Sequence, residues 1–478
     1  MKKQVRPWQW VLLLLIFFAA LRLIHFYADP DLSLTWSTGT FLTDELYHGG
    51  NGLKKALTGQ WLLSDFNYIL MDPLMPVLQW LAFKALGISL WVARLPANLL
   101  NLLLMFSLVG YVYRRAPGDR AQAAALAAFL IGTNYYFFVY GRLALLDLPM
   151  AALGFLAFIF YQWALENRRI SRWVYAGLLL LLSMLMKASA ANFFLAVIIF
   201  LLLELASKRA TKKQAATTIL LLLTVAAAHF VILKLIRHAL PIAASSLRSD
   251  TLIARKLPNG LVQAFYLYLT SLGNPFILNN AGLFLVLIVS LALLYRRYGQ
   301  IRSSAADHAM IALLISTLIF HGFFNYHPPR YYMVLSIPLT WFAATLPARL
   351  STAVTRRRVV LFAVAMVIVA NGWNIVKLGD YLLHPKYTFY QTARMVGRLI
   401  AENSSRSDFA GCLLLDNDVH TSIPFALGID FDYGAHPAGS SAHHIYLIDS
   451  HPGLQWPLLG RFRIYEKYPL NLYRLEIR

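Results

Sequence analysis

Thr43-Asp44-Glu45-Leu46-Tyr47-His48 is the stretch around which the chain is organised, and it follows the first hydrophobic run of the sequence. Two adjacent carboxylates just outside a bilayer are costly to hold near a medium of low dielectric constant, and they are well placed for proton chemistry. A second interpretation is a solvated helix start, with Thr43 as the N-cap and both acids in the first turn. The rest of the chain has to decide between these interpretations.

The composition indicates a membrane protein. Of 478 residues, 59% are hydrophobic and 14% are charged, whereas a soluble domain carries roughly 25% charged residues. A net charge of +21 would suit nucleic-acid binding, but the lysines and arginines lie mostly in short loops between apolar runs. We therefore expect no nucleic-acid partner. Cys412 is the single cysteine, which excludes an intrachain disulfide and disfavours a cysteine-based metal site.

Apolar runs near 20 residues predict a polytopic α-helical fold. The first run, from Trp8 to Phe26, resembles a signal peptide but is too long for one, so we predict an uncleaved first span. About eleven spans are expected, near 8–27, 89–113, 121–139, 147–165, 173–187, 190–206, 215–236, 279–295, 306–322, 330–347 and 359–376.

Basic clusters predict the orientation of these spans. They precede the first span and occupy every second loop after it, as the positive-inside rule requires of cytoplasmic segments. The clusters lie at 2–6, 114–120, 168–172, 208–213, 296–302 and 349–358. The N-terminus is therefore expected in the cytoplasm, and the loop 28–88 and the chain after 377 are expected outside.

Two segments outside the spans are expected to fold. The outer loop 28–88 is predicted to form short helices at 46–57 and 74–86, the second amphipathic enough to lie at the membrane surface. The tail 377–478 is predicted to be a small extracytoplasmic α/β domain with a helix at 389–402 and strands at 411–415, 443–448, 462–465 and 470–477. Residues 1–376, with the outer loop included, form the predicted transmembrane domain.

Three short outer connections each carry one cation, although the positive-inside rule disfavours cations there. These cations are Arg142, Lys187 and Arg330, the last followed by Tyr331. Snorkelling to the interface explains any one of them, but all three beside the carboxylates predict a shared anion site, since arginine and lysine recognise phosphate. An alternative phosphate loop is the basic second outer loop, 237–278, with Arg248, Arg255 and Lys256.

Asp147 is a further acidic candidate. It lies at the outer start of the fourth span, on the side expected for Asp44 and two residues before Pro149. A capping role at a helix start is one interpretation, because proline suits a first helical turn. An acid at the membrane edge is also a candidate for function.

Nucleotide and metal motifs are not evident. The sequence holds no glycine-rich phosphate loop, dinucleotide fingerprint or zinc-protease motif. Asp416-Asn417-Asp418, Asp430-Phe431-Asp432 and His443-His444 resemble oxygen-rich metal loops without EF-hand spacing, and we interpret them as polar loops at strand ends. We expect that no cofactor is required, and a divalent metal at the membrane-edge carboxylates stays an open alternative.

An ordered set of motifs runs from residue 1 to about 376. It comprises Asp44-Glu45-Leu46-Tyr47, Gly59-Gln60-Trp61, Gly87-Ile88-Ser89-Leu90-Trp91-Val92-Ala93-Arg94-Leu95-Pro96, Gly141-Arg142 with Asp147, then Lys187, then Pro329-Arg330-Tyr331. In order, spacing and sidedness this set resembles the GT-C membrane glycosyltransferases that use a polyprenyl-phosphate sugar. It is most similar to glycosyltransferase family 39, the protein O-mannosyltransferases and aminoarabinose transferases.

One stretch departs from that family. Family members often carry a lysine, or a Glu-Lys pair, before a Pro-Pro-Leu sequence in the first outer loop. Here the stretch reads Met71-Asp72-Pro73-Leu74, with an aspartate near the place of the lysine. The departure removes support for a metal ligand or a phosphate contact at that position, and it implies a donor or acceptor unlike that of the best-known members.

The resemblance implies an inverting glycosyltransferase at the outer face of the inner (plasma) membrane. Asp44 would be the general base, and Glu45 and Asp147 would position hydroxyl groups or a metal. The phosphate of an undecaprenyl-type donor would be held by Lys187, Arg142, Arg330 and Tyr331. Its partners would be this donor, an acceptor that is an envelope glycolipid such as lipopolysaccharide or a protein, and membrane lipids. The alternative is a carrier or flippase for an anionic lipid-linked solute, which the lack of an internal repeat disfavours.

Overall fold

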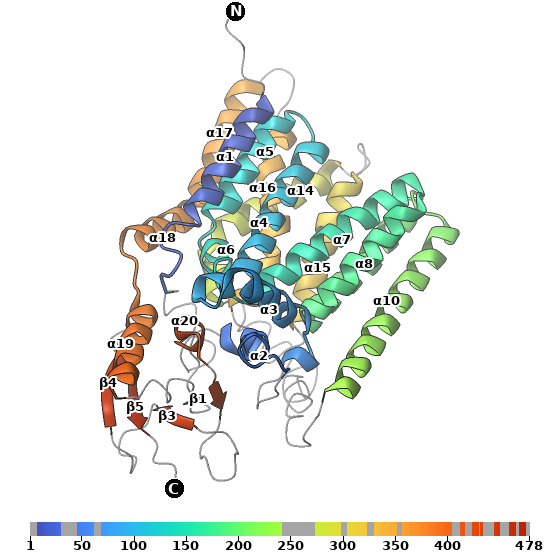
Figure 1. The fold of residues 1–478 in the computed structure, drawn as a ribbon. Helices are drawn as coiled ribbons and strands as arrows, with labels where there is room; N and C mark the ends of the chain where they lie inside the picture. Colours follow the sequence, from blue (N-terminus) through green and yellow to red (C-terminus); the bar gives the residue numbers. More distant parts are fainter. Residues whose placement is uncertain are drawn as a thin grey trace, which may run out of the picture.

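The computed structural model is mostly helical and ends in a small sheet (Figure 1). The residues that it describes are 7–29, 45–61, 68–240, 273–297, 304–322, 329–350, 356–403, 412–415, 423–429, 431–433, 444–449, 458–464 and 468–474.

Each apolar segment predicted as a span contains a helix. These helices are α1 (Pro7–Leu21), α4 (Leu90–Arg115), α5 (Arg120–Thr133), α7 (Asp147–Asn167), α8 (Ile170–Met186), α9 (Ala191–Ala206), α10 (Lys212–Ala239), α14 (Ala281–Arg297), α15 (Ala305–Gly322), α16 (Ser336–Leu350) and α17 (Arg356–Ala370). Shorter helical pieces accompany them, namely α6 (Tyr135–Tyr140), η3 (Ala188–Ala190), α13 (Pro275–Asn279), η5 (Pro329–Leu335) and α18 (Gly372–Leu383).

The predicted number of spans is not confirmed. Among the described residues, five helices are long and apolar enough to cross a membrane, or six if the pair Val360–Ala370 and Gly372–Leu383, bent by 49°, is one span. Several of the others, such as α1 and α8, are shorter than the roughly 20 residues that a bilayer requires. The chain is a multi-pass membrane protein, and the number eleven stays a prediction.

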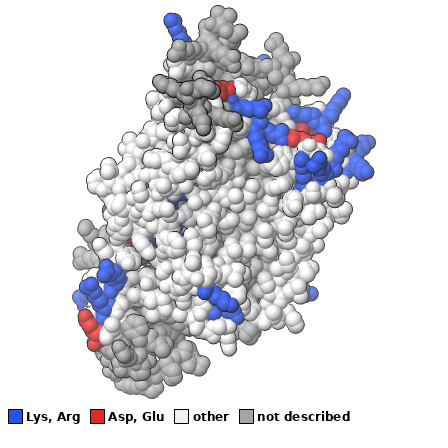
Figure 2. All heavy atoms as spheres, turned by 45° about the horizontal axis from the view of Figure 1, so that its top comes forward, with Lys and Arg blue, Asp and Glu red and all other residues white. Residues whose placement is uncertain are grey.

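Charged side chains gather toward the two ends of the bundle and leave a broad uncharged band between them (Figure 2). The helix α10 exposes Leu220, Leu223 and Phe230. Such a band is typical of a surface that faces lipid, because charged groups are costly in the hydrocarbon region.

The outer loop contains both helices that were predicted for it, α2 (Glu45–Thr58) and α3 (Leu74–Leu86), with the turn η2 (Tyr68–Leu70) between them. The two helices cross closely at a glycine. A Cβ atom added to Gly52 would lie 2.5 Å from the carbonyl oxygen of Pro76, so a larger residue would push the backbones apart. This close crossing fixes α2 against α3.

Side-chain caps determine where several helices begin. Ser89 accepts a hydrogen bond from the backbone N–H of Val92 at the start of α4, and Asp119 caps α5 in the same way. Thr211 and Gln214 form a capping box at the start of α10. These caps satisfy N–H groups that have no partner within the helix.

Buried asparagines occupy three helix breaks. Asn134 lies between α5 and α6, Asn280 between α13 and α14, and Asn371 between α17 and α18. The amides of Asn134 and Asn374 each donate to Asn280 Oδ1 at 3.1 Å, and Asn374 also donates to Asn371 at 3.0 Å. The network joins three interrupted helices. Asn374 and Asn134 also accept hydrogen bonds from the backbone N–H groups of Tyr135 and Phe137 at the start of α6, which supplies partners that a broken helix needs inside a membrane.

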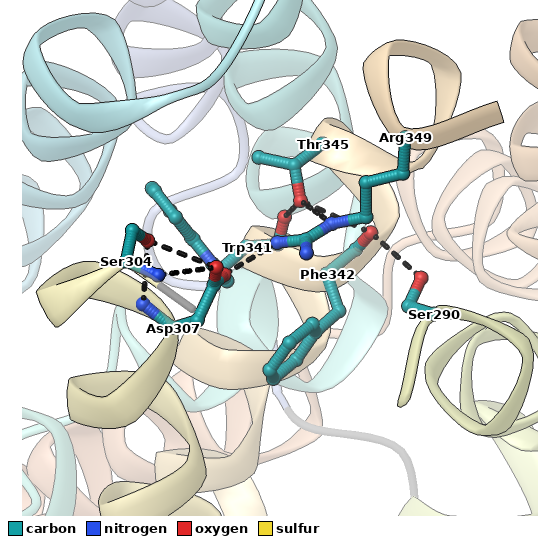
Figure 3. Close-up of polar contacts among 7 residues, drawn as sticks. All are labelled: Ser290, Ser304, Asp307, Trp341, Phe342, Thr345 and Arg349. Atoms are coloured by element: carbon teal, nitrogen blue, oxygen red, sulfur yellow. Dashed lines mark hydrogen bonds and ion pairs between the residues drawn. The ribbon is translucent and has the colours of Figure 1, made fainter. Parts of the chain in front are cut away.

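A buried ion pair joins α15 to the C-terminal end of α16 (Figure 3). Asp307 accepts hydrogen bonds from Arg349 at 2.5 Å, from the Trp341 indole at 3.0 Å and from the Ser304 hydroxyl at 2.9 Å. Thr345 in turn accepts from Arg349 Nε at 3.0 Å. Both carboxylate oxygens of Asp307 thus accept hydrogen bonds, so this buried acid stabilises the packing of α15 against α16.

The tail forms a five-stranded mixed sheet with the order β2-β1-β3-β5-β4. Its elements are α19 (Thr388–Asn403), β1 (Cys412–Leu415), α20 (Ile423–Leu427), β2 (Phe431–Tyr433), β3 (His444–Asp449), β4 (Leu458–Ile464) and β5 (Tyr468–Arg474). The helix and the four strands that were predicted are present. The interpretation as a polar loop was wrong for Phe431 and Asp432, because they pair in parallel with Leu413 and Leu414. Asp430 lies outside the described residues. A strand of three residues is too short to show an alternating pattern.

The tail shares a hydrophobic core with the outer loop. Leu46 and Leu53 of α2 and Phe83 of α3 belong to one buried cluster with Val396 and Phe425 of the tail. The rings of Phe83 and Phe425 are 5.9 Å apart. In Figure 1 the sheet accordingly lies at the end of the bundle that carries α2 and α3. The predicted boundary at 376 falls inside α18 and stays a prediction.

Candidate functional site

The acidic stretch is described from Glu45 onward. Thr43 and Asp44 lie outside the described residues, as do Arg248, Arg255 and Lys256 of the alternative phosphate loop. The site is therefore built from Glu45, Asp147 and the cations around them.

Glu45 is anchored by Arg94 of α4. Arg94 Nε and Nη2 donate to the two carboxylate oxygens at 2.8 and 2.9 Å, and its Nη1 donates to the carbonyl oxygen of Phe26 at 2.9 Å. The backbone N–H of Ala144 adds a bond to Oε1 at 2.8 Å. Both charged side chains are almost completely buried. This bidentate pair fixes the first residue of α2 against α4 and the loop before α7.

Asp147, the first residue of α7, lies between two cations. Lys187 Nζ, just after α8, is 2.5 Å from Oδ1, and Arg330 Nε of η5 is 3.6 Å from Oδ2. The side chain of Asp147 is 4% exposed, whereas those of Lys187 and Arg330 are each 12% exposed. The structure thus brings together three of the predicted residues from segments far apart in the sequence.

Tyr331 completes this cluster of Asp147, Lys187 and Arg330. Its ring centroid is 4.4 Å from Lys187 Nζ and 5.7 Å from the guanidinium carbon of Arg330. Both distances suit a cation–π contact. Tyr331 therefore lies beside both cations, and its role at the donor phosphate stays a prediction.

Asp72, which was not among the predicted site residues, joins the same region. It lies just before α3, is 5% exposed, and accepts a hydrogen bond at 3.0 Å from the backbone N–H of Ala188, the residue after Lys187. Burial raises the pKa of its carboxyl to about 7, and the charge of Lys187 opposes that rise. The aspartate near the family's lysine position therefore ties the outer loop to the corner that carries Lys187.

Asp72→Asn is expected to raise stability in a pH-dependent way. The native state keeps the proton of Asp72 to about pH 7, whereas the unfolded chain loses it near pH 4. The native state therefore loses stability as the pH rises between these values, by at most about 4 kcal/mol. Asparagine keeps the acceptor for Ala188 and removes this loss. Thermal unfolding in detergent should show a gain in melting temperature that grows from pH 5 to pH 8.

Asp380→Asn is a matched control, because this carboxylate is 71% exposed. It should give no gain that grows with pH. A gain for Asp72→Asn that is the same at pH 5 and pH 8 would contradict the prediction.

Arg142 is not part of the cluster around Asp147. It donates to the carbonyl oxygen of Ile24 at 2.7 Å and to the hydroxyl of Tyr381, and it stacks 5.2 Å from the ring centroid of Phe138. In the described part of the chain it makes no ion pair with Asp147. The alternative that Arg142 fixes Asp147 is therefore wrong, and its predicted contact with the donor phosphate has no support in this geometry.

Arg22 is a buried cation that the sequence interpretation overlooked. It lies after α1 with 0% exposure, and its guanidinium carbon is 4.9 Å from the ring centroid of Phe137. Its three side-chain nitrogens have no hydrogen-bond partner within the described residues. The sequence did contain a sign of this buried cation, because Arg22 is the single arginine inside the first apolar run.

Metal binding finds no support among the residues that the structure describes, where no group of three or more histidine, cysteine, aspartate or glutamate side chains could hold an ion. Both oxygens of Glu45 already accept from Arg94. A metal role for Glu45 or Asp147 stays untested.

The sequence matches a family model described as dolichyl-phosphate-mannose-protein mannosyltransferase over residues 72–232. The match covers less than half of the chain and includes Asp147 and Lys187 but neither Asp44 nor Arg330. No curated protein matches the sequence.

The fold is similar to that of solved membrane glycosyltransferases. ArnT from Cupriavidus metallidurans, solved bound to undecaprenyl phosphate, has a TM-score of 0.65 at 15% identity, over 97% of this chain and 98% of that one. The oligosaccharyltransferase of Archaeoglobus fulgidus, in the apo form, has a TM-score of 0.58 at 12% identity, over 92% of this chain and 69% of that one. The predicted resemblance to the GT-C class is confirmed by the family match and by this shared fold.

Proposed function

We propose that this chain, which has the fold of polyprenyl-phosphate-dependent glycosyltransferases, is an inverting glycosyltransferase. It moves a sugar from a polyprenyl phosphate to an acceptor hydroxyl at the outer face of the inner (plasma) membrane. The observation that carries the proposal is the pair of cations, Lys187 and Arg330, held at one end of an apolar bundle beside Asp147. In this proposal the phosphate of the lipid-linked donor lies beside these two cations.

The proposed reaction is a displacement at the anomeric carbon of the donor sugar. The acceptor oxygen attacks this carbon from the side opposite the phosphate, and the bond from carbon to phosphate oxygen breaks. The polyprenyl phosphate leaves with the bonding electron pair, and the acceptor proton passes to the carboxylate of Asp44. The protein thus has to supply a base and cations that stabilise the leaving phosphate.

The remaining residues have positioning roles in this proposal. Arg94 and Ala144 hold Glu45, the neighbour of the base, at the start of α2. The carboxylate of Asp147 positions a hydroxyl group of the donor or the acceptor. Envelope glycolipids such as lipopolysaccharide and secreted proteins both present suitable acceptor hydroxyls, and the ArnT structure bound to undecaprenyl phosphate supports a donor of this lipid class.

Removing a cation of the cluster is expected to impair use of the donor. A charge-assisted hydrogen bond contributes roughly 1.5–3 kcal/mol, so Lys187→Ala and Arg330→Ala should each lower kcat/KM for the donor by about tenfold to a hundredfold. Lys187→Arg should retain part of the activity, because the charge survives while the geometry differs. Steady-state kinetics with varied donor and saturating acceptor measure this effect.

Lys84→Ala is the matched control, because this lysine of α3 is exposed and its Nζ lies 5.9 Å from the ring centroid of Trp80. It should leave donor kinetics unchanged. If Lys187→Ala and Arg330→Ala also leave them unchanged, the two cations are interfacial anchors, and the loop with Arg248, Arg255 and Lys256 becomes the candidate phosphate site.

The proposed topology has eleven spans, a cytoplasmic N-terminus and an extracytoplasmic tail. In a Cys412→Ser background, single cysteines at Ser64 and Ser351 should differ in labelling by a membrane-impermeant thiol reagent on intact cells. Ser64 should react, because it lies in the outer loop, and Ser351 should react only after permeabilisation. Equal labelling at both positions would contradict the topology and the shared outer face of the site.

Comparison of cells with and without the protein tests the function directly. Mass spectrometry of envelope glycolipids and glycoproteins should show one sugar modification that depends on the chain. In proteoliposomes, net movement of a lipid-linked solute with no glycosylated product would instead favour a carrier or flippase.

A further inference from the structure

The cations assigned to the donor phosphate already have an anionic partner. Lys187 Nζ is 2.5 Å from one oxygen of Asp147, and Arg330 Nε is 3.6 Å from the other. A carboxylate and a phosphodiester both carry one negative charge and recognise the same donors. The carboxylate of Asp147 therefore stands where the proposed phosphate needs its contacts.

We infer that Asp147 is an internal competitor of the donor: it holds Lys187 and Arg330 until the donor phosphate takes them over, and its released carboxylate then accepts a hydrogen bond from a substrate hydroxyl. This inference rests on the proposed function, because it presupposes a phosphate-bearing lipid donor. It adds an order of events, since the donor has to bind before Asp147 becomes available.

The geometry suits such an exchange. The Arg330 contact, at 3.6 Å, is an ion pair that is too long for a hydrogen bond. Lys187 and Arg330 are each three times as exposed as Asp147, at 12% against 4%. An anion that arrives from outside the protein thus meets the cations before it meets the carboxylate.

Neighbouring groups keep Lys187 in place when Asp147 lets go. The ring of Tyr331 lies 4.4 Å from its ammonium group, a cation–π contact that does not depend on the carboxylate. The backbone beside Lys187 is fixed by the hydrogen bond from Ala188 to Asp72. Exchange therefore requires movement of the Asp147 side chain and leaves the backbone at Lys187, just after α8, in place.

Charge balance favours the exchange in both directions. Asp147, Lys187 and Arg330 together carry one positive charge, which a bound phosphodiester neutralises. After sugar transfer the lipid product is a phosphate monoester with about −1.5 to −2 charges at pH 7, so the occupied cluster becomes negative. This excess negative charge disfavours retention of the product beside Asp147, and the carboxylate returns to its two cations as the product leaves.

Binding of undecaprenyl monophosphate to the full-length chain in nanodiscs tests the inference. Asp147→Asn should lower the Kd of this lipid by about tenfold, because a neutral amide competes less well for the two cations. In transfer assays the same variant should show a lower KM for the donor together with a lower kcat. A higher Kd would overturn the inference, since Asp147 would then be a scaffold that orders the cations.

Two further variants make the result specific. In a Lys187→Ala background, Asp147→Asn should lose most of its gain, whereas an equal gain would indicate a general electrostatic effect and overturn the exchange. Asp380→Asn, which removes a 71% exposed carboxylate, should leave the Kd unchanged. If Asp147→Asn does not fold, the order of substrate addition in the wild-type chain decides, and productive binding of acceptor before donor overturns the inference.

The same assay distinguishes failure of the exchange from failure of the proposed function. A wild-type chain that binds no undecaprenyl monophosphate contradicts the proposed function itself. A wild-type chain that binds it, together with weaker binding by Asp147→Asn, contradicts the exchange alone.

Discussion

Asp44→Asn is expected to lower sugar transfer from a polyprenyl phosphate by roughly a hundredfold to ten-thousandfold, which is the usual contribution of a positioned general base. Asparagine has almost the same shape as aspartate but cannot accept the proton of the acceptor hydroxyl. The loss should appear in kcat, while binding of the lipid donor stays near normal. Transfer of a defined lipid-linked sugar by purified protein in nanodiscs measures both quantities.

The control for this variant is Asp380→Asn, at an exposed carboxylate of α18. It should retain wild-type activity, and both variants should unfold at the wild-type temperature. Normal turnover by Asp44→Asn would show that another group takes the proton. Asp72 would then be the first alternative to examine, because the pKa of its carboxyl lies at about 7 and suits a base at neutral pH.

Arg94→Met is expected to produce the largest loss of stability, of about 3–5 kcal/mol, because it leaves the buried carboxylate of Glu45 without a counter-charge. Arg94 makes two hydrogen bonds to Glu45, at 2.8 and 2.9 Å, and one to Phe26. Activity should fall with stability, because the start of α2 loses its attachment to α4. Thermal unfolding in detergent and transfer assays below the melting temperature measure the two effects.

The double variant Glu45→Gln/Arg94→Met separates charge from shape. It should recover part of the lost melting temperature, because no unpaired charge remains buried. Arg94→Lys should be intermediate, since an ammonium group cannot form the bidentate contact. A double variant that is less stable than Arg94→Met alone would show that the pair does not act through its buried charge.

The positions of the helices follow from the sequence. Apolar runs placed a helix in each expected span, and α3 begins and ends at the residues predicted for it. The number of spans was less predictable, because hydropathy does not reveal a break such as the one at Asn371 between α17 and α18. The Asn371 side chain is hydrogen-bonded there to the side chains of Thr133 and Asn374.

The site could be predicted only in part. The sidedness of the outer cations correctly grouped Lys187 and Arg330 with Asp147. It also grouped Arg142 with them, whereas that arginine contacts Ile24 and Tyr381. Sequence distance could not separate these cases, because all three cations lie in short connections at the same predicted face.

The sequence by itself determined the membrane class, the helical segments and the set of charged residues in the short connections between helices. Each of these depends on local composition, on hydrophobic length and on the cost of placing charge in lipid. Only the tertiary structure decided which charges neutralise each other. Glu45 is held by Arg94, Asp147 lies between Lys187 and Arg330, and Asp72 fastens the corner at Ala188. Ion pairing falls off over a few ångströms, and those distances are set by how helices from remote parts of the chain pack together.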